Sequence, residues 1–289
     1  MSARPKRKSK TSSQSPATSP TKANKPAPVK PGHASSEKSA EKQRPFLTAE
    51  WRQLAMLNYE IDPAVLAPRV PPGTELDLFQ GKALVSIVGF MFNDVRFHGL
   101  AIPWHREFPE VNLRFYVRRQ VGRELRRGVV FIKEIAPRWA VSAIARRFYH
   151  EHYVTLPMRH ELELADGSIS EGGEVTYAWR FAGKWHQCYV RTFGLAHLAA
   201  GGSLDEFITE HYWGYTSRPD GATLEYQVTH PRWRLWRAAE GYLDCDVAAL
   251  YGSEFAPALS TAPASSLLAE GSDIAMYRGN VVGEEKINH

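Results

Sequence analysis

The sequence predicts a mainly β fold, in which antiparallel hairpins form a closed or nearly closed barrel and a few helices pack outside it. Two observations favour this class. Short apolar or alternating runs recur along most of the chain, and turn residues separate most of them, as at Gln80-Gly81, Asp166-Gly167, Ala182-Gly183 and Asp220-Gly221. The 289 residues are also 43% hydrophobic and include 8 Trp, 13 Phe and 12 Tyr, which is enough apolar material for one sizeable core.

The expected elements follow from these signals along the chain. Helices are expected where a capping residue or an amphipathic period occurs: one that starts within Phe46–Trp51 with Thr48 as its cap, a short one opened by Asp62-Pro63, one over Arg138–Tyr149, and one over Leu204–His211 opened by Ser203 and Glu206. Strands are expected over the apolar or alternating runs: Glu75–Phe79, Ala83–Phe92, Val111–Arg118, Val129–Ile135, Val154–Leu164, Glu174–Phe181, Trp185–Phe193, Leu224–Thr229 and Ile274–Tyr277. Strands outnumber helices, which makes the prediction mainly β (α+β).

Residues 1–45 differ in composition from the rest of the chain. They carry a net charge of +9, contain seven Pro and nine Ser, and include only Met1 and Val29 as apolar residues larger than Ala, whereas the remaining residues carry −4. A segment that buries so little apolar surface cannot offset the entropy of ordering, so we predict a disordered basic tail over 1–45 and a single domain over 46–289. Any nucleic-acid contact is therefore expected through the tail only.

The sequence gives no sign of a membrane or secreted protein. No apolar run approaches the roughly 20 residues that cross a bilayer, and no apolar segment follows the basic start. Cys188 and Cys245 are too few for a disulfide framework. We therefore expect a cytoplasmic protein without a membrane partner, and the oligomeric state is not indicated.

One predicted strand, Val111–Arg118, carries a polar stripe. Its strict alternation places Asn112, Arg114 and Tyr116 on one face and the apolar residues on the other. If the polar face points to water, this is an ordinary amphipathic strand. If helices cover the outside of a barrel, the stripe lines the interior, where Arg114 offers a planar guanidinium to a carboxylate or phosphate. The pattern alone leaves both alternatives open.

Motifs for common chemistry are few. The sequence has no CxxC, GxGxxG, GxxxxGK[ST], GxSxG or HExxH motif. His150 and His152 have a metal-ligand spacing, but a metal site needs a third ligand, for which the candidates are His160, His186, His211 and His230. We interpret the pair as core or hydrogen-bonding residues and predict no metal and no cofactor.

Lysine is scarce after residue 45. The four lysines are Lys82, Lys133, Lys184 and Lys286. Lys133 lies in an apolar strand, where a desolvated amine would have a lowered pKa; the alternative, which we favour, is a strand-end lysine that reaches solvent beside Glu134. The aromatic residues Tyr212, Trp213, Tyr215, Trp233 and Trp236 are interpreted mainly as core.

Several motifs occur together and in order: Val70-Pro71-Pro72-Gly73-Thr74-Glu75-Leu76-Asp77 with Gly81, Val111-Asn112-Leu113-Arg114 with Tyr116-Val117-Arg118, Tyr149 and Tyr153, and Glu210 and Tyr212 with His230-Pro231 and Trp233. On these motifs, the chain resembles the YqjF-like family of domains of unknown function from about Trp51 to Tyr277. The resemblance implies an acetoacetate decarboxylase-like fold, a cone-shaped antiparallel β-barrel with the ligand site inside. It also favours the interior alternative for the polar stripe.

The resemblance to the decarboxylases themselves is poorer at one decisive place. Those enzymes carry an adjacent pair of lysines, one of which forms an imine with the substrate. The corresponding segment, Arg146–Met158, contains His150 and His152 but no lysine. Fold similarity therefore does not imply imine-based decarboxylation in this chain.

Three hypotheses follow, and the sequence leaves turnover open. In the first, the interior binds a small anionic, carboxylate-bearing molecule through the ligand-binding residues Asn112, Arg114, Tyr116, Tyr149 and Tyr153, and a proton acceptor is supplied by His150, His152 or His230. In the second, the protein is a non-enzymatic regulatory module tethered to nucleic acid or a protein partner by its basic tail. In the third, the polar residues only satisfy one another inside a small barrel.

Overall fold

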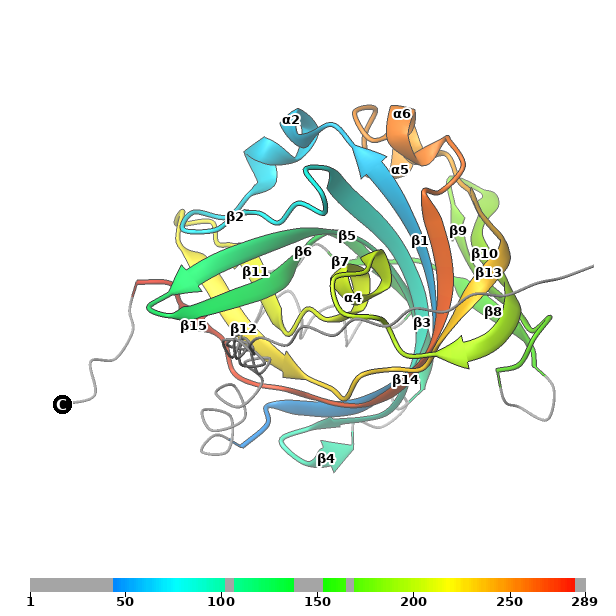
Figure 1. Ribbon diagram of the computed structural model, residues 1–289, viewed down its shortest axis with the longest axis horizontal. Helices are drawn as coiled ribbons and strands as arrows, with labels where there is room; N and C mark the ends of the chain where they lie inside the picture. Colours follow the sequence, from blue (N-terminus) through cyan, green and yellow to red (C-terminus); the bar gives the residue numbers. More distant parts are fainter. Residues whose placement is uncertain (1–43, 102–106, 138–152, 165–168, 284–289) are drawn as a thin grey trace, which may run out of the picture. The chain divides into compact units, whose positions relative to one another are not determined.

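The computed structural model describes residues 44–101, 107–137, 153–164 and 169–283. Within these ranges, seven strands form a hydrogen-bonded ring in the order β12-β11-β6-β5-β3-β1-β14 (Figure 1). Their bounds are β1 (Leu47–Ile61), β3 (Ala83–Phe97), β5 (Phe108–Val121), β6 (Glu124–Ala136), β11 (Trp213–Ser217), β12 (Thr223–Thr229) and β14 (Ser265–Met276). The ring closes because Val228 and Thr229 of β12 pair with Met276 and Ala275 of β14. Neighbours in the ring are antiparallel except β6 and β11, which are parallel.

A second layer of sheet continues from β14 and packs on the outside of the ring. Its strands are β13 (Leu235–Asp244), β10 (Lys184–His197), β9 (Glu174–Phe181) and β8 (Met158–Glu163). The Tyr177 hydroxyl of β9 donates a hydrogen bond to the Gln53 carbonyl of β1 at 2.9 Å. Gly89 of β3 permits this approach, because a Cβ atom there would lie 2.5 Å from the Tyr177 ring.

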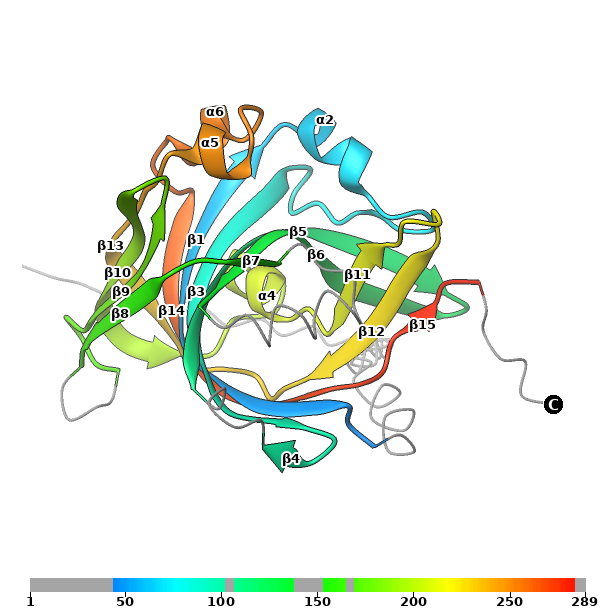
Figure 2. The same ribbon diagram turned by 180° about the vertical axis from the view of Figure 1, so that it is seen from behind.

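Short elements complete the fold: the strands β2 (Glu75–Leu76), β4 (Leu100–Ala101), β7 (Tyr153–Thr155) and β15 (Asn280–Val281), the helices α2 (Pro63–Leu66), α4 (Leu204–Thr209), α5 (Val247–Tyr251) and α6 (Ala256–Leu259), and the 3-10 helix η1 (Ala67–Arg69). In both views, α4 lies in the opening of the ring, whereas α2, α5 and α6 lie at its rim (Figure 1 and Figure 2). Residues of α4 therefore form part of the wall of the interior.

Alternation along the ring strands produces two separate cores. On β3, Val88 and Phe90 face the inside of the ring, whereas Val85 and Ile87 face the outer layer. Because β3 is buried on both faces, its sequence over Ala83–Phe92 is apolar almost throughout. The inner core surrounds a cavity, and the outer core joins β1, β3 and β5 to the second layer.

The mainly β prediction is confirmed, as are several local signals. Strand β9 has the predicted bounds, Glu174–Phe181. The Asp62 side chain accepts a hydrogen bond from the Ala64 amide at 2.9 Å and caps α2. The Ser203 hydroxyl accepts from the Glu206 amide at 3.2 Å and caps α4. The carboxylate of Glu206 accepts from the Gly202 amide, so the capping box is offset by one residue.

The helix expected to start within Phe46–Trp51 is wrong, because this segment belongs to β1. Strand β1 pairs with β3 on one side and β14 on the other, and both partners lie far away in sequence. The cap signal at Thr48 spans only a few residues, and two long ladders with burial on both faces outweigh it. Trp51, assigned to a helix from the sequence, therefore points into the ring from a strand.

Other boundaries also differ. The strand expected over Val154–Leu164 is two strands, β7 and β8, because Pro157 has no amide hydrogen for a ladder. The strand expected over Glu75–Phe79 is limited to β2. No prediction covered β11, β13, α5 and α6, and most of β14, up to Asp273, was also missed. Much of β13 is partly exposed and carries charges, so it lacks a clear period of two.

Some predictions fall outside the described residues. These are the tail, apart from Arg44 and Pro45, and the helix over Arg138–Tyr149. The disordered tail and the single domain over 46–289 therefore stay predictions. In the part of the chain that the structure describes, no helix is long and apolar enough to cross a membrane.

Candidate functional site

A cavity of about 90 Å³ lies inside the ring, and its wall is mostly apolar and aromatic. A water molecule needs roughly 10–15 Å³ of such space, so the cavity has room for a molecule of about six to nine non-hydrogen atoms. The polar side chains on its described wall are Glu110, Asn112, Arg114, Glu134, Tyr153, Thr209, His211, Tyr226 and His230. A few polar groups that converge in an apolar pocket are typical of a small-molecule site.

Strand β5 supplies the polar stripe of the wall. The second layer covers its apolar face, where Leu113 and Phe115 join the outer core. Its other face therefore points inward, and Asn112 and Arg114 line the cavity together with Glu110, which extends the same alternation toward the start of the strand. Of the two alternatives left open by the sequence pattern, the structure has the one in which the polar stripe lines the interior.

Arg114 is a buried cation on this wall, with 9% of its surface exposed. Its Nη2 donates to the Ile208 carbonyl of α4 at 3.2 Å, and its guanidinium carbon lies 5.7 Å from the centre of the Tyr116 ring. Its Nε atom is buried and has no hydrogen-bond partner among the described residues. A guanidinium stays charged in proteins and carries five N–H donors, so part of its donor capacity is unused.

Asn112 and Tyr153 both contact the buried carboxylate of Glu110. The Asn112 amide nitrogen lies 3.3 Å from Glu110 Oε1, and the Tyr153 hydroxyl donates to Glu110 Oε2 at 2.8 Å. The amide oxygen of Asn112 is buried and has no partner among the described residues. The predicted ligand-binding residues Asn112 and Tyr153 therefore meet on one side of the cavity.

Tyr116 supports the wall from behind. Its hydroxyl lies 2.6 Å from the Ser86 hydroxyl, which in turn donates to Asn58 Oδ1 at 2.6 Å. Its ring lies 4.7 Å from the His211 ring, centre to centre. Tyr116 does not line the cavity in the structure, although it shares a face with Arg114.

His211 follows α4 and lies on the wall with 2% of its side chain exposed. Its Nε2 is 3.5 Å from Asp77 Oδ2, and Asp77 also accepts from Arg127 Nε at 2.6 Å. Burial lowers the pKa of His211 to about 4, despite the opposing effect of Asp77. Burial alone raises the pKa of Asp77, but its contacts with His211 and Arg127 outweigh that effect and lower it. At neutral pH, the imidazole of His211 is therefore uncharged and the carboxylate of Asp77 is ionised.

His230, predicted as a proton acceptor, also lines the cavity. Its ring stacks on the Trp233 ring with centres 4.2 Å apart, and its Nδ1 lies 3.0 Å from the Pro231 carbonyl. Burial lowers the pKa of His230 to about 4, since it outweighs the backbone contact with Pro231, and nearby Arg114 lowers it further. His230 is therefore neutral at pH 7, as His211 is.

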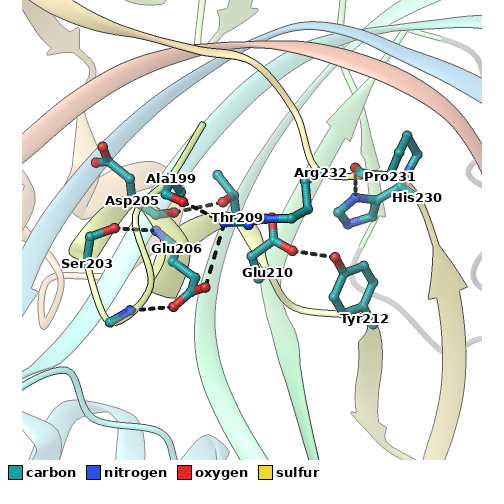
Figure 3. A network of polar contacts seen from close by, with 11 residues as sticks. Ala199, Ser203, Asp205, Glu206, Thr209, Glu210, Tyr212, His230, Pro231 and Arg232 are labelled. Carbon is teal, nitrogen blue, oxygen red and sulfur yellow. Dashed lines mark hydrogen bonds and ion pairs between the residues drawn. The ribbon is translucent and has the colours of Figure 1, made fainter. Parts of the chain in front are cut away.

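A polar network holds α4 and the His230 segment in place (Figure 3). Arg232 donates to the Ala199 carbonyl at 2.6 Å and lies 3.7 Å from carboxylate oxygens of both Glu206 and Glu210. Tyr212 donates a short hydrogen bond to Glu210. Because α4 contributes Ile208 and Thr209 to the cavity, this network fixes one side of the wall.

The structure also places residues that the sequence analysis weighed for other chemistry. Lys133 is half-buried, and its ammonium donates to the Leu250 carbonyl of α5 instead of reaching solvent beside Glu134. Burial lowers the pKa of Lys133. None of the described residues that line the cavity is a lysine. Cys188 is buried as expected, and burial raises the pKa of Cys245 to about 12.

The described residues give no support to a metal site built on His150 and His152. Tyr149, His150 and His152 lie outside the described residues. His160 packs near Tyr177, and His186 accepts from the Asp246 amide at 3.3 Å, so both belong to the outer layer. No group of three His, Cys, Asp or Glu suited to a metal occurs within the described ranges.

The site residues predicted from the sequence did not include several residues of the wall, among them Trp51, Glu110, Glu134, Thr209 and His211. Glu110 was accessible, because it lies two residues before Asn112 in the same alternation. Trp51 was hidden by the wrong helix assignment. Trp213 and Trp233, interpreted as core, line the cavity, while Tyr215 and Trp236 are buried core residues.

Comparison with known proteins shows to which proteins this chain is similar. Residues 48–273 match the family model of DUF2071, described as an uncharacterized conserved protein. The uncharacterized protein YqjF of Bacillus subtilis (strain 168) is 29% identical over 193 residues, which cover 65% of this chain and 74% of YqjF.

Solved structures of low sequence identity share the fold. An acetoacetate decarboxylase-like enzyme from Sphingomonas wittichii RW1 aligns with a TM-score of 0.60 at 12% identity, covering 83% of this chain and 94% of that one. Acetoacetate decarboxylase from Legionella pneumophila aligns with a TM-score of 0.57 at 14% identity, covering 83% and 88%. The enduracididine biosynthesis enzyme MppR, complexed with pyruvate, aligns with a TM-score of 0.58 at 14% identity, covering 88% and 98%. The expected cone-like, acetoacetate decarboxylase-like fold is confirmed.

Proposed function

Since the chain belongs to the DUF2071 family and has the acetoacetate decarboxylase-like fold, we propose that it binds a small carboxylate-bearing molecule inside the ring. Arg114 is the anchor. The observation that supports this proposal most is the buried Nε of Arg114, which has no hydrogen-bond partner among the described residues and lies on the wall of a mostly apolar cavity.

Beside the carboxylate residues Glu110 and Glu134, the wall carries a cation, Arg114, with which a bound anion can pair. Among the described lining residues, Arg114 is the cation at neutral pH, because the pKa values of His211 and His230 are lowered to about 4. Glu110 already accepts from Tyr153 and Asn112. A buried guanidinium is stabilised by a carboxylate that accepts two parallel hydrogen bonds. A bound carboxylate supplies that interaction with Arg114.

The remaining predicted residues have supporting parts in this proposal. Asn112 and Tyr153 orient the ligand, and Tyr116 holds the wall behind Arg114. His230 is the described candidate for a proton acceptor, because it is neutral and lines the cavity. Tyr149, His150 and His152 keep the roles expected from the sequence. The pyruvate complex of MppR supports a carboxylate ligand in this fold.

The proposal concerns binding and includes no imine chemistry, because Lys133 contacts α5 and not the cavity. A cytoplasmic location belongs to the same proposal, and the two free thiols, Cys188 and Cys245, agree with a reducing compartment.

Calorimetric titration tests the proposal with butyrate and its uncharged analogue butyramide. Butyrate is expected to bind and butyramide to bind much more weakly. Arg114→Met should weaken butyrate binding roughly 10- to 150-fold, the usual effect of a lost charged hydrogen bond. Arg191→Met is the matched control, because Arg191 pairs with Glu240 on the exposed outer layer. Equal butyrate affinity for Arg114→Met and wild type, with both folded by circular dichroism, would refute the proposal.

The charge of residues 1–45 supports a second candidate function, a tether to nucleic acid. Residues 1–45 carry a net charge of +9, whereas the rest of the chain carries −4. Deleting residues 1–45 is expected to abolish binding to a labelled DNA duplex at about 50 mM salt, and about 200 mM salt should weaken the full-length complex. An unchanged affinity after the deletion excludes this function.

A further inference from the structure

Buried polar atoms without a hydrogen-bond partner among the described residues include, on the cavity wall, Trp51 Nε1, Asn112 Oδ1, Arg114 Nε and both ring nitrogens of His211, whose Nε2 lies 3.5 Å from Asp77 Oδ2. Buried polar groups are normally paired, and an unpaired one costs free energy. Except for His211 Nε2, which faces Asp77, these atoms indicate which hydrogen-bonding groups a ligand in this cavity must supply. Trp51 and Arg114 can only donate.

The free amide oxygen of Asn112 is an acceptor by necessity. Its amide nitrogen faces Glu110 Oε1 at 3.3 Å, and Glu110 also receives the Tyr153 hydroxyl at 2.8 Å. Rotating the amide by half a turn would bring its oxygen against a carboxylate oxygen. The Glu110 carboxylate therefore fixes the amide so that Oδ1 is the unpaired atom.

The free nitrogen of His211 is an acceptor for the same reason. Its Nε2 lies 3.5 Å from Asp77 Oδ2, so the ring proton belongs on Nε2. Arg127 holds Asp77 from the other side at 2.6 Å, and Arg114 and Tyr116 also face the His211 ring. The neutral imidazole therefore keeps a lone pair on Nδ1 and donates nothing there.

We propose that the cavity takes a short hydroxycarboxylic acid, whose carboxylate binds Arg114 and whose hydroxyl donates to the acceptors Asn112 Oδ1 or His211 Nδ1. This inference rests on the proposed function and names its ligand class. A keto acid or a simple fatty acid has no donor hydrogen once it is ionised, so it leaves both acceptors unpaired. Trp51 Nε1 then donates to an oxygen of the bound acid.

The size and chemistry of the wall restrict the class further. The cavity volume of about 90 Å³ suits an acid of three to five carbons, and apolar side chains such as Phe90 and Phe108 surround its carbon chain. An amino acid also carries donor hydrogens, but its ammonium would lie in the same cavity as the Arg114 guanidinium. We therefore favour a hydroxyl as the donor.

The four-carbon series separates these classes at constant chain length. Calorimetric titration of the full-length protein with 2-hydroxybutyrate, 3-hydroxybutyrate, 2-oxobutyrate, acetoacetate, 2-aminobutyrate and butyrate compares their affinities. At least one hydroxy acid is expected to bind at least about tenfold more tightly than its keto analogue and than butyrate, which is a typical effect of pairing one buried acceptor.

Two variants test whether Asn112 and His211 cause the preference for a hydroxy acid. Asn112→Leu removes one acceptor, and His211→Phe removes the other while it keeps a ring against Tyr116 and Phe207. At least one of them is expected to reduce the preference for the hydroxy acid to less than about threefold. His160→Phe is the matched control, because His160 lies on the outer layer near Tyr177. Thermal melts show whether each variant is folded, and the wild-type ligand series needs no variant.

The outcomes separate this inference from the function on which it rests. If the acids bind in an Arg114-dependent manner but the keto acid or the amino acid binds as tightly as the hydroxy acid, the inference is wrong and the proposed function stands. If none of the acids binds, both fail. A hydroxy acid preference that survives in both folded variants would also overturn the assignment to Asn112 and His211.

Discussion

Acidification is expected to destabilise the protein through His211, which is buried and neutral beside the cavity. Burial lowers the pKa of His211 from 6.5 to about 4. Below about pH 6.5, the unfolded chain therefore takes up a proton on this side chain that the folded protein excludes until about pH 4. The stabilisation that the neutral His211 provides is fully present above pH 6.5, and the free energy of unfolding falls as the pH decreases from 6.5 to about 4.

The size of the effect follows from the two pKa values. One pKa unit corresponds to about 1.4 kcal/mol, so the full loss below pH 4 is about 3 kcal/mol. Between pH 7 and pH 5, the same linkage gives a loss of about 2 kcal/mol from His211 alone. Asp77 titrates in a more acidic window, because its pKa is lowered from 3.8, so it contributes little above pH 5.

Urea unfolding at pH 7 and pH 5 measures this effect when wild type is compared with His211→Phe. The stability of wild type relative to the variant is expected to fall by about 2 kcal/mol on going to pH 5, since the variant has no group to protonate at this position. Effects of titrating groups that do not contact the His211 side chain cancel in the comparison. His98→Gln, at an exposed histidine, should follow wild type. A wild-type-minus-variant difference that stays constant to about 0.5 kcal/mol would refute the buried, neutral assignment.

Three further predictions test the fold and the placement of the site. Gly89→Ala is expected to lower the free energy of unfolding by about 1–3 kcal/mol, because the added methyl group would lie 2.5 Å from the Tyr177 ring. Gly201→Ala is the control and should leave the stability unchanged, because there is open space around Gly201. Equal urea midpoints for the two variants would contradict the packing of the two layers. Ser203→Ala removes the cap of α4 and should cost about 1 kcal/mol in thermal unfolding, and an unchanged melting temperature would count against the capping role. Lys133→Met should leave butyrate affinity within about threefold of wild type, because its ammonium contacts Leu250; loss of binding would place Lys133 in the site.

The strand Val111–Arg118 shows how far local pattern extends. Its alternation correctly predicts a strand and correctly groups Asn112, Arg114 and Tyr116 on one face, because side chains alternate at every residue of a strand. It cannot show which face is interior. That depends on β8 and β9, which cover the apolar face from elsewhere in the chain.

The first strand shows where local pattern fails. Thr48 and Glu50 indicate a helix start, and the structure places both in β1, where they pair with β14 and β3. The partners of Thr48 and Glu50 in those ladders lie more than 40 residues away, so no local window contains the free energy of this pairing. The position of Trp51 on the cavity wall was lost with it.

The sequence by itself determined the mainly β class, the members of the polar stripe and the caps of α2 and α4, because propensity, alternation and capping act between neighbouring residues. Tertiary structure alone decided that the ring closes between β12 and β14 and that the stripe faces a cavity. It also decided which atoms remain free for a ligand. Glu110 orients Asn112 within one strand, but Asp77 reaches His211 from a distant segment, and burial of both pairs depends on the closed ring. Hydrogen-bond direction and desolvation depend on the complete surroundings of a side chain, and long-range contacts supply most of those surroundings in a β fold.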